Sequence, residues 1–134
     1  MVDKVNIIQL KHVRVKDNRV DIYFSVEGKI QKYFHKSHHL FFEYNYNVSD
    51  IPISILTIPF VANIAPLAWI TDSKLIVSEL DQTFFECLNK VKQGYSNMFP
   101  KAKFKGDIQV GKVVNNTYKS EIAAVQLFSG DCII

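Results

Sequence analysis

Residues 51–70 read IPISILTIPFVANIAPLAWI, a run of twenty residues without a charged side chain. A helix of this length and composition is long enough to cross a bilayer. The run also contains Pro52, Pro59 and Pro66, and the last two would each remove a helical hydrogen bond and disfavour helical dihedrals in the preceding residue. The sequence therefore favours a buried pair of short helices, broken by proline, over a membrane span.

The segment that follows predicts one long amphipathic helix. Residues 78–81, SELD, match the capping-box pattern in which a serine caps the helix and an acid stands three positions later. Apolar residues then recur at steps of three and four, which places them on one face of a helix. They are Phe84, Phe85, Leu88, Val91, Tyr95 and Met98. Pro100 marks the end of this helix.

Before residue 51 the pattern changes to alternation of apolar and polar residues, which is typical of β-strands. Residues 5–15, 20–26 and 30–34 predict a three-stranded antiparallel meander with turns at Asp17-Asn18 and Glu27-Gly28. Residues 40–46, LFFEYNY, are aromatic and predict a further strand.

After the meander and around the long helix the sequence predicts shorter strands. Residues 74–77 indicate a short strand, residues 103–114 one or two strands around Gly106 and Gly111, and residues 123–128 a buried strand of parallel-sheet type. Lys101, Lys103 and Lys105 alternate with apolar residues, as in a half-exposed strand. The predicted fold is thus a single α+β domain over residues 1–134: an N-terminal antiparallel meander, a proline-broken helix pair, a long amphipathic helix and C-terminal strands.

Composition limits the function classes. The chain has 134 residues, 48% of them hydrophobic, and 16 basic and 13 acidic residues give a net charge of +3 without any block of like charges. This spread argues against specific nucleic-acid binding. Two cysteines without metal-binding spacing, and no apolar leader at the N-terminus, predict a cytoplasmic protein without disulfides.

Two groups of polar residues are candidates for chemistry. His35, His38 and His39, followed by Glu43, have a spacing that can bind a metal, although a solvated loop explains them more simply. The carboxylates of Asp72, Glu79 and Asp81 surround the start of the long helix, where capping is the simpler interpretation and a polar site beside Trp69 the alternative.

The strongest functional signal is at the C-terminal end, where a predicted buried strand runs into Ser129-Gly130. Small residues after a strand allow backbone N–H groups to approach a phosphate. Residues 127–131, LFSGD, resemble the opening of the Phe-Ser-Gly-Gly-x-Asp-Ser loop (PP-loop) of ATP pyrophosphatases. Residues 51–60, 68–72 and 79–84, together with Gly94-Tyr95, Pro100 and residues 104–106, resemble the region before that loop in proteins similar to 7-cyano-7-deazaguanine synthase, including members tied to bacterial defence loci.

The resemblance implies the N-terminal region of a PP-loop protein, truncated at the start of the loop. In that family the loop binds the phosphates of ATP, with magnesium, and the enzyme adenylates an oxygen and releases pyrophosphate. Here Asp131 replaces the second glycine and the x-Asp-Ser that should follow is absent, so only Ser129 and Gly130 can be assigned to nucleotide binding.

Three functions remain open at this point. The first is a non-catalytic accessory domain that serves docking or substrate gating for a catalytic half, through a protein partner or self-association. The second is a nucleotide-binding enzyme subunit that completes its site by oligomerisation and then binds ATP and magnesium. The third is an unrelated interaction module that uses residues 40–46 for edge pairing.

Overall fold

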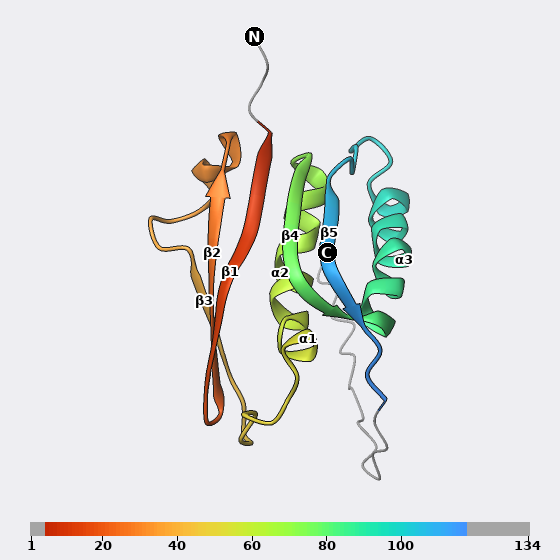
Figure 1. Ribbon diagram of the computed structural model, residues 1–134. Coiled ribbons are helices and arrows are strands. Elements are labelled where there is room, and N and C mark those ends of the chain that lie inside the picture. Colours follow the sequence, from red (N-terminus) through yellow and green to blue (C-terminus); the bar gives the residue numbers. More distant parts are fainter. Residues whose placement is uncertain (1–4, 118–134) are drawn as a thin grey trace, which may run out of the picture.

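The computed structural model describes residues 5–117 and shows the expected α+β class (Figure 1). A five-stranded mixed sheet has the strand order β3-β2-β1-β4-β5. The strands are β1 (Asn6–Lys16), β2 (Arg19–Glu27), β3 (His39–Glu43), β4 (Ser73–Asp81) and β5 (Asp107–Val114). Strands β1, β2 and β3 pair antiparallel, whereas β4 pairs parallel with both β1 and β5.

The meander is confirmed, but its third strand is a different segment from the one predicted. Residues 30–34 were expected to be that strand, and instead Lys29–Tyr33 form the 3-10 helix η1. Gly28, at φ 96°, turns the chain out of the sheet, and within η1 only Ile30 is buried, so the segment lacks the alternating face that a strand needs. Strand β3, which belongs to the aromatic segment 40–46, pairs with β2 in its place.

The proline-rich segment forms the predicted helix pair, α1 (Ile53–Leu56) and α2 (Ile58–Ile70). The break falls at Thr57, just before Pro59 in the first turn of α2. Helix α2 continues through Pro66, which lacks the N–H that would bond the carbonyl of Ala62. Ala62, whose carbonyl Pro66 cannot bond, is an exposed residue. In the described part of the chain, the helices are too short or too polar to span a bilayer.

The long amphipathic helix is confirmed as α3 (Gln82–Met98). Its cap is not Ser78, which lies within β4, but Asp81, whose Oδ2 accepts a hydrogen bond from the Phe84 N–H at 3.1 Å. Strand β4 extends beyond the predicted residues 74–77 because Leu80 and Asp81 are also buried. Asn116 Nδ2 donates to Asp81 Oδ1 at 2.9 Å and thereby ties the end of β5 to the start of α3.

The lysine-rich segment does not form a strand. Lys101, Lys103 and Lys105 lie exposed in the loop before β5, while Phe104 is half-buried. The loop is held by the Gly106 N–H, which donates to the Trp69 carbonyl at 3.0 Å rather than to a neighbouring strand. The predicted alternation of exposure is therefore present without the strand.

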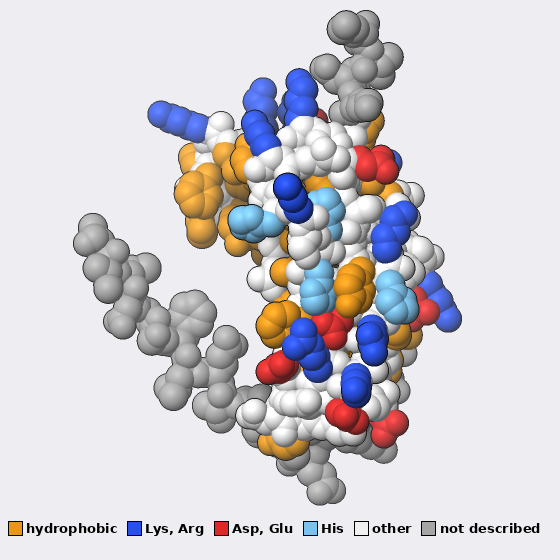
Figure 2. Space-filling model, turned by 90° about the vertical axis from the view of Figure 1, so that its left-hand side faces the viewer, with side chains coloured by type: hydrophobic (Ala, Val, Ile, Leu, Met, Phe, Trp, Pro, Cys, Tyr) orange, Lys and Arg blue, Asp and Glu red, His pale blue; other side chains and the backbone are white. Residues whose placement is uncertain are grey.

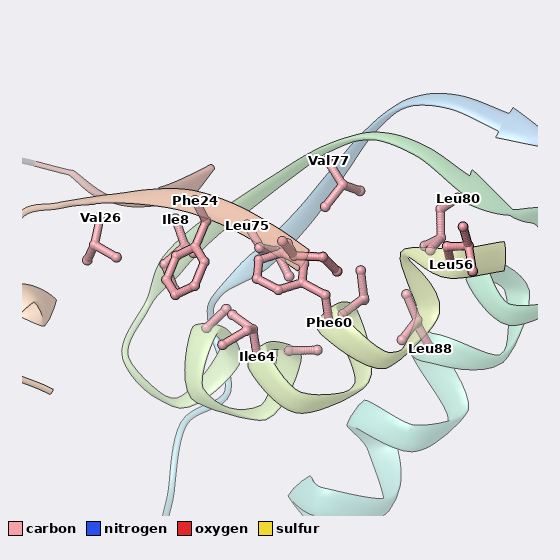
Figure 3. Packing of buried hydrophobic residues seen from close by; sticks show 14 of the residues in the cluster. Ile8, Phe24, Val26, Leu56, Phe60, Ile64, Leu75, Val77, Leu80 and Leu88 are labelled. Atoms are coloured by element: carbon pink, nitrogen blue, oxygen red, sulfur yellow. The ribbon is translucent and has the colours of Figure 1, made fainter. Parts of the chain in front are cut away.

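The hydrophobic core lies between the sheet and the helices. Figure 3 shows side chains of α1 and α2 pointing toward those of the strands. Phe60, on α2, is fully buried, and its ring centroid lies 5.4 Å from that of Phe24 on β2. Because side chains alternate across a strand, the face of β1, β2 and β3 opposite this core carries a second set of side chains.

Candidate functional site

The apolar stripe of helix α3 is only partly buried. Of its 17 residues only Leu88 is buried. Val91 and Met98, farther along the stripe, are 47% and 66% exposed, and Phe99 after the helix is 52% exposed. An amphipathic helix normally buries this stripe, so part of the apolar surface of α3 is left free within the described structure.

This free surface borders a groove between α2 and α3. A hollow of about 290 Å³ lies between the ends of the two helices and the following loop, and a smaller one of about 130 Å³ continues it along the helices. The larger hollow is lined by Pro66, Leu67, Ile70, Tyr95, Phe99, Ala102 and Phe104. We call this set the α2–α3 groove. All of its lining side chains are apolar or aromatic.

The walls of the groove are fixed by contacts behind it. The Tyr95 ring lies 6.2 Å from the Trp69 ring and 6.0 Å from the Phe104 ring, measured between centroids. Lys92 Nζ donates to the Gly106 carbonyl at 2.8 Å. These contacts join α2, α3 and the loop before β5, so the groove is preformed.

The structure shows whether Trp69 borders a polar site, which the sequence left open. It is 2% exposed and its ring packs against Tyr95, so it is a core residue that also borders a hollow of about 250 Å³ beside α3. Asp72 lies in the turn after α2 with φ 54°, and Asp81 caps α3 at the other end of β4. The structure therefore does not gather Asp72, Glu79 and Asp81 into a polar site beside Trp69.

The three clustered histidines also separate. His35 is exposed in the loop, His38 packs 5.7 Å from the Phe24 ring, and His39 belongs to β3. Among residues 5–117 no group of three metal-binding side chains forms. The solvated-loop interpretation fits His35, whereas His38 and His39 pack against aromatic rings.

The outer face of the antiparallel strands carries a surface that the sequence analysis missed. His12, Tyr23 and His39 lie opposite one another in the register of β1, β2 and β3. The Tyr23 and His39 rings stack at 4.5 Å, the His12 ring lies 6.2 Å from Tyr23, and Phe41 lies 6.3 Å from His39. We call these four residues the ring ladder; Figure 2 shows histidine and hydrophobic side chains side by side on this face. The register was the missing information, because these residues lie far apart in sequence.

An ion-pair network lies beside the ladder. Arg19 donates to Asp21 at 3.1 Å and to Glu43 at 3.3 Å, and its guanidinium lies 4.1 Å from the centre of the Phe41 ring. His39 Nε2 donates to the same Asp21 carboxylate at 2.7 Å. The hydrogen bonds from Arg19, followed by the one from His39, lower the pKa of Asp21 below its ordinary value.

The Asp21 carboxylate should therefore titrate below the ordinary value of 3.8 when followed by carbon-13 NMR. Because its pKa is lower in the folded than in the unfolded protein, its stabilising contribution is complete above the unfolded value and is lost as the pH falls through the folded value. Arg19→Gln should move the midpoint up toward 3.8, and more than His39→Gln does. An unchanged midpoint in Arg19→Gln would contradict this assignment.

The other candidate residues fall elsewhere. Ser129, Gly130, Cys132 and the predicted strand 123–128 lie outside the described residues. Cys87 is exposed on α3 as a free thiol. The edge strand β3 pairs only with β2 within the described sheet, as the edge-pairing hypothesis requires.

Comparisons with known proteins add no relative. No family model matches the chain, and neither a curated protein nor a solved structure resembles it at a significant level.

Proposed function

We propose that this chain is a non-catalytic accessory domain that docks onto the catalytic domain of an ATP-pyrophosphatase-like protein, of the 7-cyano-7-deazaguanine synthase type. The observation that carries the proposal is the α2–α3 groove. Contiguous exposed apolar patches, when they exceed a few hundred Å², often mark protein–protein interaction sites. Ile70, Met98 and Phe99 are all at least half exposed around this groove.

Three of the segments that resemble the PP-loop family contribute side chains to the same groove. Residues 68–72 contribute Ile70, Gly94-Tyr95 contributes Tyr95, and residues 104–106 contribute Phe104. Residues 68–72 lie more than 20 residues before Gly94-Tyr95 in sequence and meet the other two segments in the fold. The family resemblance and the exposed surface therefore support the same docking role.

Burial of this surface would supply substantial binding energy. Complete burial of one large apolar side chain is worth about 1.5–3 kcal/mol. Three half-exposed side chains around the groove would therefore contribute a few kcal/mol before the cost of association is subtracted. A central cluster of this kind is what dominates the affinity of most protein interfaces.

Biolayer interferometry against a purified PP-loop protein of this type from the same genome tests the proposal. We expect saturable binding that Phe99→Asp weakens at least tenfold, because a charge at the groove would have to be buried without a partner. Tyr46→Asp is the matched control: Tyr46 is 80% exposed, outside the groove, and should leave the affinity unchanged. Equal binding by the two variants would reject the groove as the docking surface.

The same assay tests edge pairing, and a separate calorimetric titration tests nucleotide binding. Edge pairing by β3 predicts that Phe41→Asp abolishes binding while Phe99→Asp does not, because a charge on an edge strand opposes strand addition. A nucleotide-binding subunit predicts saturable calorimetric binding of ATP and magnesium by the chain alone. Either result would replace the accessory-domain proposal.

A further inference from the structure

We infer that the ring ladder binds single-stranded nucleic acid without sequence preference, with a base stacked on the outer face of His12 and further contacts along the exposed edges of Tyr23, His39 and Phe41. This is a second site, on the sheet face opposite the helices, and it does not depend on the docking proposal. Three of the strands each contribute at least one ring, and the rings lie 4.5–6.3 Å from their neighbours.

The rings are accessible to a ligand. Phe41 is 53% exposed and Tyr23 38% exposed, and His12 is also exposed. The Tyr23 and His39 planes differ by only 12°, and those of His12 and Tyr23 by 25°. A base can continue such a stack at the His12 end, where one ring face points away from Tyr23. Proteins that bind single strands without sequence preference combine such stacking with a positively charged path for the backbone.

The charges next to the ladder complement a phosphate backbone. The register of the β1–β2 hairpin puts Arg14 opposite Asp21 and Lys16 opposite Arg19, on the same face as Tyr23. Within the described residues, the carboxylates of Asp21 and Glu43 are bound by Arg19, whereas Arg14 and Lys16 form no ion pair. The two free cations are therefore available for phosphate contacts.

The chemistry favours a single strand over the other polyanions. In a duplex the faces of the bases are already stacked on one another, so they cannot reach the rings, and an acidic peptide offers charges without ring faces. The three strands of the ladder span roughly 10 Å, which accommodates only a few nucleotides. We therefore expect modest affinity with strong salt dependence.

Fluorescence anisotropy with labelled 12-mers of deoxythymidine and of uridine, at low salt, tests the inference. We expect saturable binding of at least one of the two oligonucleotides, and which of them binds tells whether the natural ligand is DNA or RNA. A 12-base-pair duplex should bind more weakly. Tyr23→Ala should weaken binding about fivefold or more, because His12 loses the ring against which it stacks and no longer holds the base in place. Tyr23→Phe keeps that ring and should retain binding. Tyr46→Ala, which removes an exposed ring elsewhere, is the matched control.

A second variant tests the charges separately and does not perturb the ring stack. Arg14→Gln with Lys16→Gln should reduce the slope of log affinity against log salt by about 1.4, or about 0.7 for each lost phosphate contact. Heparin should bind equally to the native chain and to Tyr23→Ala, because it has no bases. Phe99→Asp, the variant that tests the docking proposal, should not affect oligonucleotide binding. The docking proposal and this inference can therefore fail separately. Equal affinity for duplex and single strand, no loss in Tyr23→Ala, or no binding at all would overturn the inference.

Discussion

Replacing Gly106 by alanine should destabilise the protein by about 3 kcal/mol, the cost expected when a side chain is forced against fixed backbone. A β-carbon at this position would overlap the Ala68 carbonyl oxygen and lie 2.7 Å from the Trp69 Cα. Both atoms belong to the buried end of α2 and cannot turn away as a flexible side chain would. The backbone shift needed to relieve this overlap would also break the 3.0 Å hydrogen bond from the Gly106 N–H to the Trp69 carbonyl.

Thermal unfolding followed by circular dichroism measures the effect, which should be a loss of roughly 10 °C in Tm. Gly94→Ala is the matched control, since a β-carbon at Gly94 meets no atom within 4 Å and the residue lies inside α3. That change should stabilise the helix by about 0.5–1 kcal/mol. If both variants lost stability equally, the close approach of the loop to α2 would be wrong, and with it the account of how the groove is held.

Elements that depend on local pattern could be predicted from the sequence. The apolar stripe of α3 is visible in the sequence as apolar residues at helical spacing. The turn between β1 and β2 is visible as the turn-forming pair Asp17-Asn18. The start of α3 shows the limit of this approach. Ser78 and Asp81 are both residue types that cap helices well. Asp81 is the cap because β4 stays paired with β5 through that residue, so the helix cannot begin earlier.

Elements that depend on distant partners could not be predicted. Residues 30–34 and 40–46 both read as strands, and only pairing with β2 distinguishes the second from the first. Pro66 lies inside α2 although proline lacks a helical hydrogen-bond donor, and the exposure of Ala62 four residues earlier is not visible in a single sequence. Local propensity gives way to tertiary context in each case.

Both candidate surfaces belong to this second group. The α2–α3 groove joins side chains from residue 66 to residue 104, and the ring ladder joins His12 to Phe41. The even spread of charge along the chain argued against nucleic acid, yet the hairpin register brings Arg14, Lys16 and Arg19 to one face. Charge clustering on a sheet depends on register, and register is set by burial of the other face.

Replacing Phe60 by alanine should cost about 3–5 kcal/mol, a large part of the total stability of a domain of this size. Phe60 is fully buried, and its ring contacts that of Phe24 on β2. Urea unfolding measures the loss. Phe99→Ala is the matched control, because Phe99 is 52% exposed and its removal should cost less than about 1 kcal/mol. Similar losses in the two variants would contradict the burial of Phe60.

The position of Phe60 also predicts where the loss will appear. The antiparallel and parallel halves of the sheet are joined by pairing of β1 with β4 over only four residues, Asn6–Gln9 with Ser73–Ile76. Side chains such as Phe60, in one cluster with Ile8 and Leu75, must therefore hold the halves together across the core (Figure 3). Hydrogen exchange in Phe60→Ala should accelerate in β2 and in β4 alike. Acceleration confined to α2 would mean that the two halves are held together by strand pairing alone.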